Sequence, residues 1–196
     1  MEDKIKYFTQ SELKNLFKAI DSAEDRHKIR DMAIVRLAYY CGLRATEIGI
    51  ITYANYNKAT KEIYCKRLKG SWNNTIRIDK VTVKVLNNYI KEYGPFKDMD
   101  ILFKSQEGNP ISRKTLDRIM KKYCKKANIN DVSKHHFHTL KHSCGVHLAE
   151  SGLDIKEVNF WLGHKNINNT MVYFQFTTKQ QEQLYKKLDK SSAMVK

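Results

Sequence analysis

The chain has 196 residues, of which 41% are hydrophobic and 29% charged. A soluble chain of this length can bury a core, and its apolar runs fall far short of the roughly 20 residues that a membrane helix needs. The formal net charge of +15 favours a polyanionic partner, because each phosphate that a protein neutralises releases condensed counterions. The cations run along the whole chain instead of one amphipathic helix, which argues against a membrane surface.

The amino terminus and the cysteines indicate an intracellular protein. Residues 1–4 lead into no apolar stretch, so we recognise no signal peptide and expect a cytoplasmic protein. The four cysteines are widely separated and form no C-x-x-C pair, which argues against a zinc ribbon and against a disulfide framework. We therefore expect reduced thiols that are buried or partly buried.

Capping and termination signals mark the first helices. Thr9 and Glu12 have the spacing of a capping box, and the apolar residues after them recur at helical spacing. A second helix is predicted over about residues 25–41 and ends at Gly42, which suits a left-handed C-terminal cap. Arg44 follows almost directly, at the predicted entry to a short helix.

A β-hairpin is predicted in the next segment. Residues 62–68 and 75–78 have strand character, and residues 69–74 between them are rich in turn formers. A helix over about residues 80–93 follows, and a Gly-Pro pair stops it.

The second half of the chain is predicted to be helical. Ser112 has the position of an N-cap for a basic amphipathic helix that reaches about residue 127. Further helices are expected over about residues 136–151, 155–162, 168–174 and 179–188. The predicted fold class is mainly α, formally α+β, with a small β-hairpin or three-stranded sheet.

Two segments carry cations suited to a phosphate. The guanidinium of Arg44 offers two parallel donors to two phosphate oxygens, and Glu47 is placed three residues later to orient it. His138 and Lys141 are also three residues apart, so on a helix both side chains point the same way and can address one phosphate.

A phenol completes the set of reactive groups. Tyr173 comes nine residues after His164, which itself follows the tight turn predicted at Leu162-Gly163. A tyrosine hydroxyl, with an ordinary pKa of about 10, becomes a nucleophile when neighbours take its proton and cations neutralise the phosphate. Together these residues provide what attack on a phosphodiester requires.

The order of Gly42-Leu43-Arg44-Ala45-Thr46-Glu47, His138-Thr139-Leu140-Lys141, Leu162-Gly163-His164 and Tyr173 closely resembles the catalytic domain of the tyrosine recombinase (phage integrase) family. The resemblance covers about residues 8–176. It implies that Tyr173 attacks phosphorus to leave a 3′-phosphotyrosine link, that a hairpin lysine protonates the leaving 5′ oxygen, and that His164 orients the scissile phosphate. The catalytic residues implied are Arg44, Lys69, His138, Lys141, His164 and Tyr173.

The same resemblance implies that no cofactor is needed, because the phosphotyrosine stores the bond energy and protein cations supply the electrostatics. A zinc site is the alternative use of the histidines, since His138 and His142 are four residues apart. No Glu follows His138 and no cysteine pair completes such a site, so we expect no metal.

Two positions in this pattern stay open. The family's second arginine is a lysine here, Lys141, which keeps the charge but lacks the planar fork of two aligned donors. We expect this change to weaken transition-state stabilisation and to affect rate more than fold. In the hairpin, Lys66 and Arg67 compete with Lys69 for the role of proton donor.

The expected partner is double-stranded DNA, bound by a homo-oligomer that is a monomer when free and a tetramer in the synapse. Residues 1–196 are interpreted as a single catalytic domain without a separate N-terminal DNA-binding domain. Residues 178–196 are candidates for exchange between protomers. The predicted DNA-binding residues are Lys66, Arg67, Arg77, Arg113, Lys114 and Arg118.

The predicted function is site-specific DNA recombination, by integration, excision or inversion of a mobile element. One alternative is a DNA-binding relative with reduced or lost catalysis that acts as an accessory or regulator, which the lysine at position 141 motivates. Another is relaxation of DNA like that of a type IB topoisomerase. The sequence leaves the target site and the reaction direction open.

Overall fold

The computed structural model describes residues 5–68, 70–174 and 178–190 of the chain. The described chain is mainly helical, with one small sheet, as the sequence predicts. In chain order its elements are α1 (Gln10–Asp21), α2 (Lys28–Cys41), α3 (Ala45–Ile48), η1 (Tyr53–Asn55), β1 (Tyr56–Asn57), β2 (Glu62–Cys65), β3 (Asn74–Arg77), α4 (Lys80–Tyr93), α5 (Arg113–Lys126), η2 (Val132–Lys134), α6 (His138–Glu150), α7 (Ile155–Leu162), α8 (Asn168–Met171), η3 (Val172–Phe174) and α9 (Thr178–Lys190).

The predicted caps start and stop the helices as expected. Thr9 and Glu12 form the capping box of α1, and Ser112 caps α5 by accepting a hydrogen bond from Thr115 N. Gly42 and Gly163 end α2 and α7 in the left-handed conformation, at φ 58° and 66°, which glycine adopts without steric cost.

The sheet is antiparallel, in the order β1-β2-β3. Strand β2 pairs with β3 in a register that places Ile63 opposite Ile76 and Cys65 opposite Asn74. The inward residues Ile63, Cys65 and Ile76 are buried, so one face of the hairpin packs on the core.

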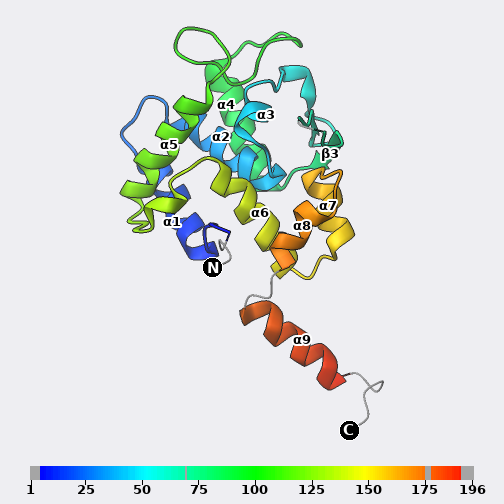
Figure 1. Cartoon of the computed structure of the whole chain (residues 1–196). Helices are drawn as coiled ribbons and strands as arrows, with labels where there is room; N and C mark the ends of the chain where they lie inside the picture. The colour runs from blue at the N-terminus through cyan, green and yellow to red at the C-terminus, as the bar shows by residue number, and fades with distance from the viewer. Residues whose placement is uncertain (1–4, 69, 175–177, 191–196) are drawn as a thin grey trace.

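Two hydrophobic clusters form the core, and α6 takes part in both. The larger cluster includes residues of α1, α2, α4 and α5 together with Leu140 of α6. The smaller one joins α6, α7 and η3 through Cys144, Val158, Leu162 and Tyr173. Figure 1 shows α6 between the larger helical body and the pair α7 and α8. Helix α6 therefore fixes where its polar residues lie relative to both parts.

The last helix projects from this body. Figure 1 shows α9 extending away from the other elements toward the C-terminus. Its Leu184, Tyr185 and Leu188 are exposed by 39%, 63% and 40%. None of the helices in the described ranges combines the length and the apolar character needed to span a bilayer. The four cysteines are free and buried, as predicted.

Candidate active site

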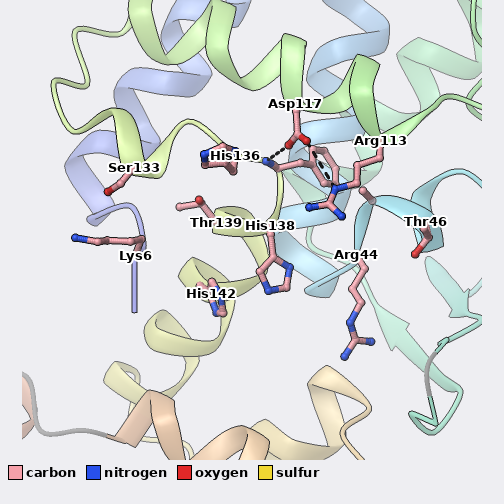
Figure 2. Close-up of a pocket in the computed structure, with 12 residues that line it drawn as sticks. Lys6, Arg44, Thr46, Arg113, Asp117, Ser133, His136, His138, Thr139 and His142 are labelled. Carbon is pink, nitrogen blue, oxygen red and sulfur yellow. Dashed lines mark hydrogen bonds and ion pairs between the residues drawn. The ribbon is translucent and has the colours of Figure 1, made fainter. Parts of the chain in front are cut away.

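A cationic cavity lies where the start of α6 faces α3 and the start of α5. Its volume is about 530 Å³. The residues that line it are Lys6, Arg44, Ala45, Thr46, Arg113, Asp117, Ser133, His136, Phe137, His138, Thr139 and His142. Figure 2 shows the side chains of Arg44, Arg113 and His138 around the same space. Three basic side chains and three imidazoles against one carboxylate make the cavity suited to an anion.

Arg44 is the N-cap residue of α3 and is held by Glu47, as the sequence predicts. Its Nη1 donates to Glu47 Oε1 at 2.8 Å and to Ser71 Oγ at 3.2 Å, and its backbone N–H donates to Glu47 Oε2 at 2.9 Å. The Arg44 side chain is 21% exposed, while the Glu47 side chain is fully buried. The carboxylate therefore fixes the guanidinium while part of it still reaches the cavity.

Glu47 is charged despite its burial. Burial opposes ionisation, but the backbone hydrogen bond from Arg44 and the charges of Lys141 and Arg67 lower the pKa of Glu47 below its usual value. The carboxylate also accepts the backbone N–H of Leu68 at 3.2 Å, which ties the hairpin to the start of α3. One buried anion thus organises several cations and the β2–β3 connection.

The prediction that Arg67 binds DNA is wrong, because its side chain has no exposed surface. The guanidinium donates to three backbone carbonyls at the ends of α2 and α7, which are Cys41 O, Gly42 O and Trp161 O. It also donates to two side chains, at Asn74 Oδ1 and Glu47 Oε2. These contacts occupy its donors, so Arg67 joins the hairpin to α2 and α7 inside the protein.

Lys141 does not reach the cavity with His138, contrary to the prediction from their spacing. It is 2% exposed, and its Nζ donates to Gly42 O at 3.1 Å and Leu162 O at 3.3 Å. The side chain therefore ties the end of α2 to the end of α7. Burial, followed by the charges of Arg67 and Arg44, lowers the pKa of Lys141 to about 7.

His138 is the first residue of α6 and lines the cavity, as predicted. Partial burial, followed by the charges of Lys141 and Arg44, lowers its pKa. One turn later His142 packs edge-on against it, with ring centroids 4.3 Å apart. Burial and His138 lower the pKa of His142 to about 4, so the His142 ring is neutral near pH 7.

The tautomer of His164 follows from its hydrogen bonds. Asn159 Nδ2 donates to His164 O at 2.8 Å, so Asn159 Oδ1 is the acceptor for the Thr170 hydroxyl at 2.8 Å. Because that hydroxyl has one proton, it accepts from His164 Nδ1–H at 2.9 Å. Burial, followed by Lys141, lowers the pKa of His164 to about 3. The neutral ring therefore presents the lone pair of Nε2.

Tyr173 lies in a slot on α6. It is 3% exposed, and its hydroxyl is 3.2 Å from Nδ1 of His142. A Cβ at Gly145 would lie 2.7 Å from ring carbons of Tyr173, so the slot exists because this position is glycine. The Tyr173 ring is also nearly parallel to that of His164, with centroids 6.3 Å apart. Burial raises the pKa of the phenol, which is therefore protonated.

The remaining predicted residues differ in how the structure places them. Lys69 lies outside the described residues, but its neighbours Leu68 and Ser71 both contact the Arg44–Glu47 pair. The predicted DNA-binding residues with exposed side chains are Lys66, Arg77, Arg113, Lys114 and Arg118. Of these five, Arg113 lines the cavity.

Sequence reasoning missed His142, Ser71 and Thr170 as parts of the site. The four-residue spacing from His138 is the one signal that places His142 on the same face of α6. Ser71 and Thr170 have no such signal, because their contacts depend on the tertiary fold. In the described part of the chain, no three His, Cys, Asp or Glu side chains lie together in a way that suits a metal ion.

A model of the phage integrase family matches residues 6–180 of the chain. Among curated relatives, the type 1 fimbriae regulatory protein FimB of Escherichia coli (strain K12) is 31% identical over 169 residues, which cover 85% of this chain and 82% of that protein. The tyrosine recombinase XerA of Pyrococcus furiosus is 31% identical over 177 residues, covering 89% of this chain and 58% of XerA. The chain thus spans most of FimB but little more than half of XerA.

Solved structures share the fold. The crystal structure of XerA recombinase matches with a TM-score of 0.78 and 24% identity, over 92% of this chain and 62% of that chain. The XerH site-specific recombinase bound to palindromic difH substrate, in a post-cleavage complex, matches with a TM-score of 0.80 and 20% identity, over 95% and 54%.

Proposed function

This chain belongs to the phage integrase family and is a tyrosine-type site-specific recombinase, and we propose from this premise that Tyr173 is its nucleophile and that the cationic cavity receives the scissile phosphate of double-stranded DNA. The observation that carries the proposal is the Tyr173 hydroxyl, 3.2 Å from His142, a residue of the cavity wall. The side chain of His142 therefore lies between the phenol of Tyr173 and the proposed phosphate site.

The groups around the cavity have different roles in binding the phosphate. Arg44, oriented by Glu47, binds two phosphate oxygens, and His138 donates a further hydrogen bond from the first turn of α6. His164 lies beside the Tyr173 ring. Neutral His164 has a lone pair at Nε2 and cannot donate a hydrogen bond from that atom. It donates to the phosphate only after Nε2 takes up a proton, and a bound anion favours this protonation.

The chemical step then exchanges one phosphodiester for another. The Tyr173 oxygen forms a bond to phosphorus while the bond between phosphorus and the 5′ oxygen breaks. The phenolic proton passes to an imidazole, of which His142 is at hydrogen-bond distance, and the leaving 5′ oxygen takes a proton from Lys69 of the hairpin. Attack by the 5′ hydroxyl of another strand reverses the step and completes rejoining.

The resting position of Tyr173 has a consequence for this step. The phenol is buried behind His142 and its pKa is raised. The ring or His142 therefore moves before attack, and the cations of the cavity lower the cost of the phenolate once phosphate is bound.

Assembly on DNA is part of the proposal. Helix α9 exposes Leu184, Tyr185 and Leu188, an apolar set at helical spacing that suits burial against a neighbouring protomer. We assign residues 178–196 to this exchange, within a tetramer that holds two duplexes. We assign DNA-backbone contacts to Lys66, Arg77, Arg113, Lys114 and Arg118, which are all exposed.

A nicked duplex tests the proposal. A target site is first recovered by selecting bound duplexes from a random-sequence library, and a nick beside the cleavage point traps the covalent product. We expect a protein–DNA adduct with the natural chain and none with Tyr173→Phe. Binding without an adduct would instead favour an accessory protein. On a supercoiled plasmid that carries the recovered site, relaxation without recombinant joints would favour a topoisomerase.

A further inference from the structure

Position 141 leaves the cavity without its second guanidinium. Lys141 carries one ammonium, and that group donates to the carbonyls of Gly42 and Leu162 instead of facing the cavity. Arg44 then supplies the fork on one side of the phosphate site. A phosphoryl group that gains charge in the transition state is bound best by donors from more than one direction.

Arg113 lies on another side of the same cavity. It is the first residue of α5 and lines the cavity with Arg44 and His138, and Figure 2 shows its guanidinium between α5 and the imidazole of His138. Its side chain is 78% exposed, so its donors are open to a ligand. The pKa of His138 is lowered by burial first, then by the charges of Lys141 and Arg44, and also by the charge of Arg113 across the cavity.

Asp117 holds this arginine in relation to His138. Its Oδ2 lies 3.8 Å from Arg113 Nε, and its Oδ1 accepts the backbone N–H of Phe137 at 2.9 Å. Phe137 directly precedes His138, so one carboxylate links the start of α5 to the start of α6 (Figure 2). This ion pair involves Nε of Arg113 and not its two Nη groups.

We propose that Arg113 is a further catalytic residue, the second guanidinium that binds the scissile phosphate in place of the residue at position 141, and that Asp117 is its positioning residue. The proposal rests on the proposed function and deepens it. It assigns to Arg113 a contact with the reacting phosphate, whereas Lys114 and Arg118 on the same helix contact DNA away from it.

The first test is single-turnover cleavage of the nicked duplex at saturating protein, which separates rate from affinity. Arg113→Ala is expected to lower the cleavage rate by roughly 100-fold, the loss typical of one preorganised donor, and Arg113→Lys to recover only part of it because the fork is missing. Lys125→Ala removes an exposed cation from the last turn of α5 and should leave the rate unchanged. Equal rates for Arg113→Ala and Lys125→Ala would overturn the proposal.

The second test asks which phosphate Arg113 contacts. A methylphosphonate at the scissile position removes the phosphate's negative charge, so the rate penalty of Arg113→Ala should shrink to a few-fold at most on that substrate. A penalty that stays at full size would place Arg113 on another phosphate and refute the assignment.

The third test concerns the link to position 141. Arginine at position 141 has a longer side chain, which can extend past the carbonyls of Gly42 and Leu162 and bring a second fork to the cavity. In a Lys141→Arg background Arg113→Ala should therefore slow cleavage less than in the natural chain. An identical slowing would reject the idea that Arg113 stands in for an arginine at position 141. Failure of this inference is distinguishable from failure of the proposed function. The former leaves a Tyr173-dependent adduct that Arg113→Ala does not slow, and the latter leaves no adduct at all.

Discussion

The carboxylate of Glu47 lies 3.4 Å from the guanidinium of Arg67, and neither side chain has exposed surface. Glu47 binds Arg44 at 2.8 Å through its other oxygen. The buried Arg67 links the hairpin to the ends of α2 and α7, whereas Arg44 reaches the cavity. One carboxylate therefore connects the stability of the fold to the orientation of Arg44, a proposed catalytic residue.

Replacing Glu47 by Gln is expected to lower both stability and cleavage. It leaves Arg67 buried without its anion, and breaking such a pair costs about 3–5 kcal/mol of unfolding free energy. Urea unfolding measures the loss. The matched control is Glu92→Gln, at an exposed position where a change within about 0.5 kcal/mol is expected. Equal unfolding free energies for the two variants would contradict this role of Glu47.

Acid is expected to destabilise the protein through its buried imidazoles. In the folded chain the pKa values of His142 and His164 are lowered to about 4 and about 3, while unfolded histidine titrates near 6.5. The unfolded state thus binds more protons below pH 6.5, so stability falls as the pH drops from 6.5 toward 4, by at most about 1.4 kcal/mol per pH unit for each imidazole.

The variant His142→Gln isolates one of these contributions. Its unfolding free energy, measured in urea at pH 7, 6 and 5, should fall less steeply with acid than that of the natural chain. Parallel curves for the two proteins would mean that His142 titrates alike in the folded and unfolded states.

Lys141→Arg should accelerate cleavage increasingly at alkaline pH. The ammonium of Lys141, whose pKa is lowered to about 7, loses its charge above that pH, whereas a guanidinium keeps it. The ratio of variant to natural single-turnover rates is expected to rise between pH 7 and pH 9, because the charged fraction of Lys141 falls by up to about tenfold per pH unit in this range. Taking the ratio cancels the titration of the nucleophile. A ratio that does not change with pH would show that the Lys141 charge does not limit the reaction.

Gly145→Ala should disturb the slot that holds Tyr173. Its Cβ would lie 2.7 Å from the ring, and such overpacking costs typically about 1–3 kcal/mol. Thermal unfolding checks the size of the effect. In a Tyr173→Ala background the ring is absent, so the same glycine substitution should cost much less. Additive effects of the two substitutions would argue against the contact.

Local signals in the sequence were sufficient to predict most of the helices. The capping box at Thr9, the N-cap at Ser112 and the glycine that ends α2 are encoded within a few residues, and all three are confirmed. The spacing of Arg44 and Glu47 likewise predicted their contact correctly. Each of these features depends on neighbours that are close in the chain.

Contacts between distant segments could not be predicted in this way. Charge and spacing alone assign Arg67 to DNA and Lys141 to phosphate, but both side chains bind carbonyls at the ends of α2 and α7. The residues that bury them are up to 99 positions away in the chain. In a sequence with many cations, a side chain that becomes buried cannot be distinguished from one on the surface until the packing of the helices is known.

The most direct measurement of the central claim is the position of the covalent link. The natural chain, trapped on a nicked duplex, is digested with trypsin and nuclease, and the modified peptide is sequenced by mass spectrometry. We predict a nucleotide joined to the Tyr173 oxygen, in the tryptic peptide spanning residues 166–179. A link at Tyr185, or at any other residue, would contradict the assignment of the nucleophile and of the cavity beside it.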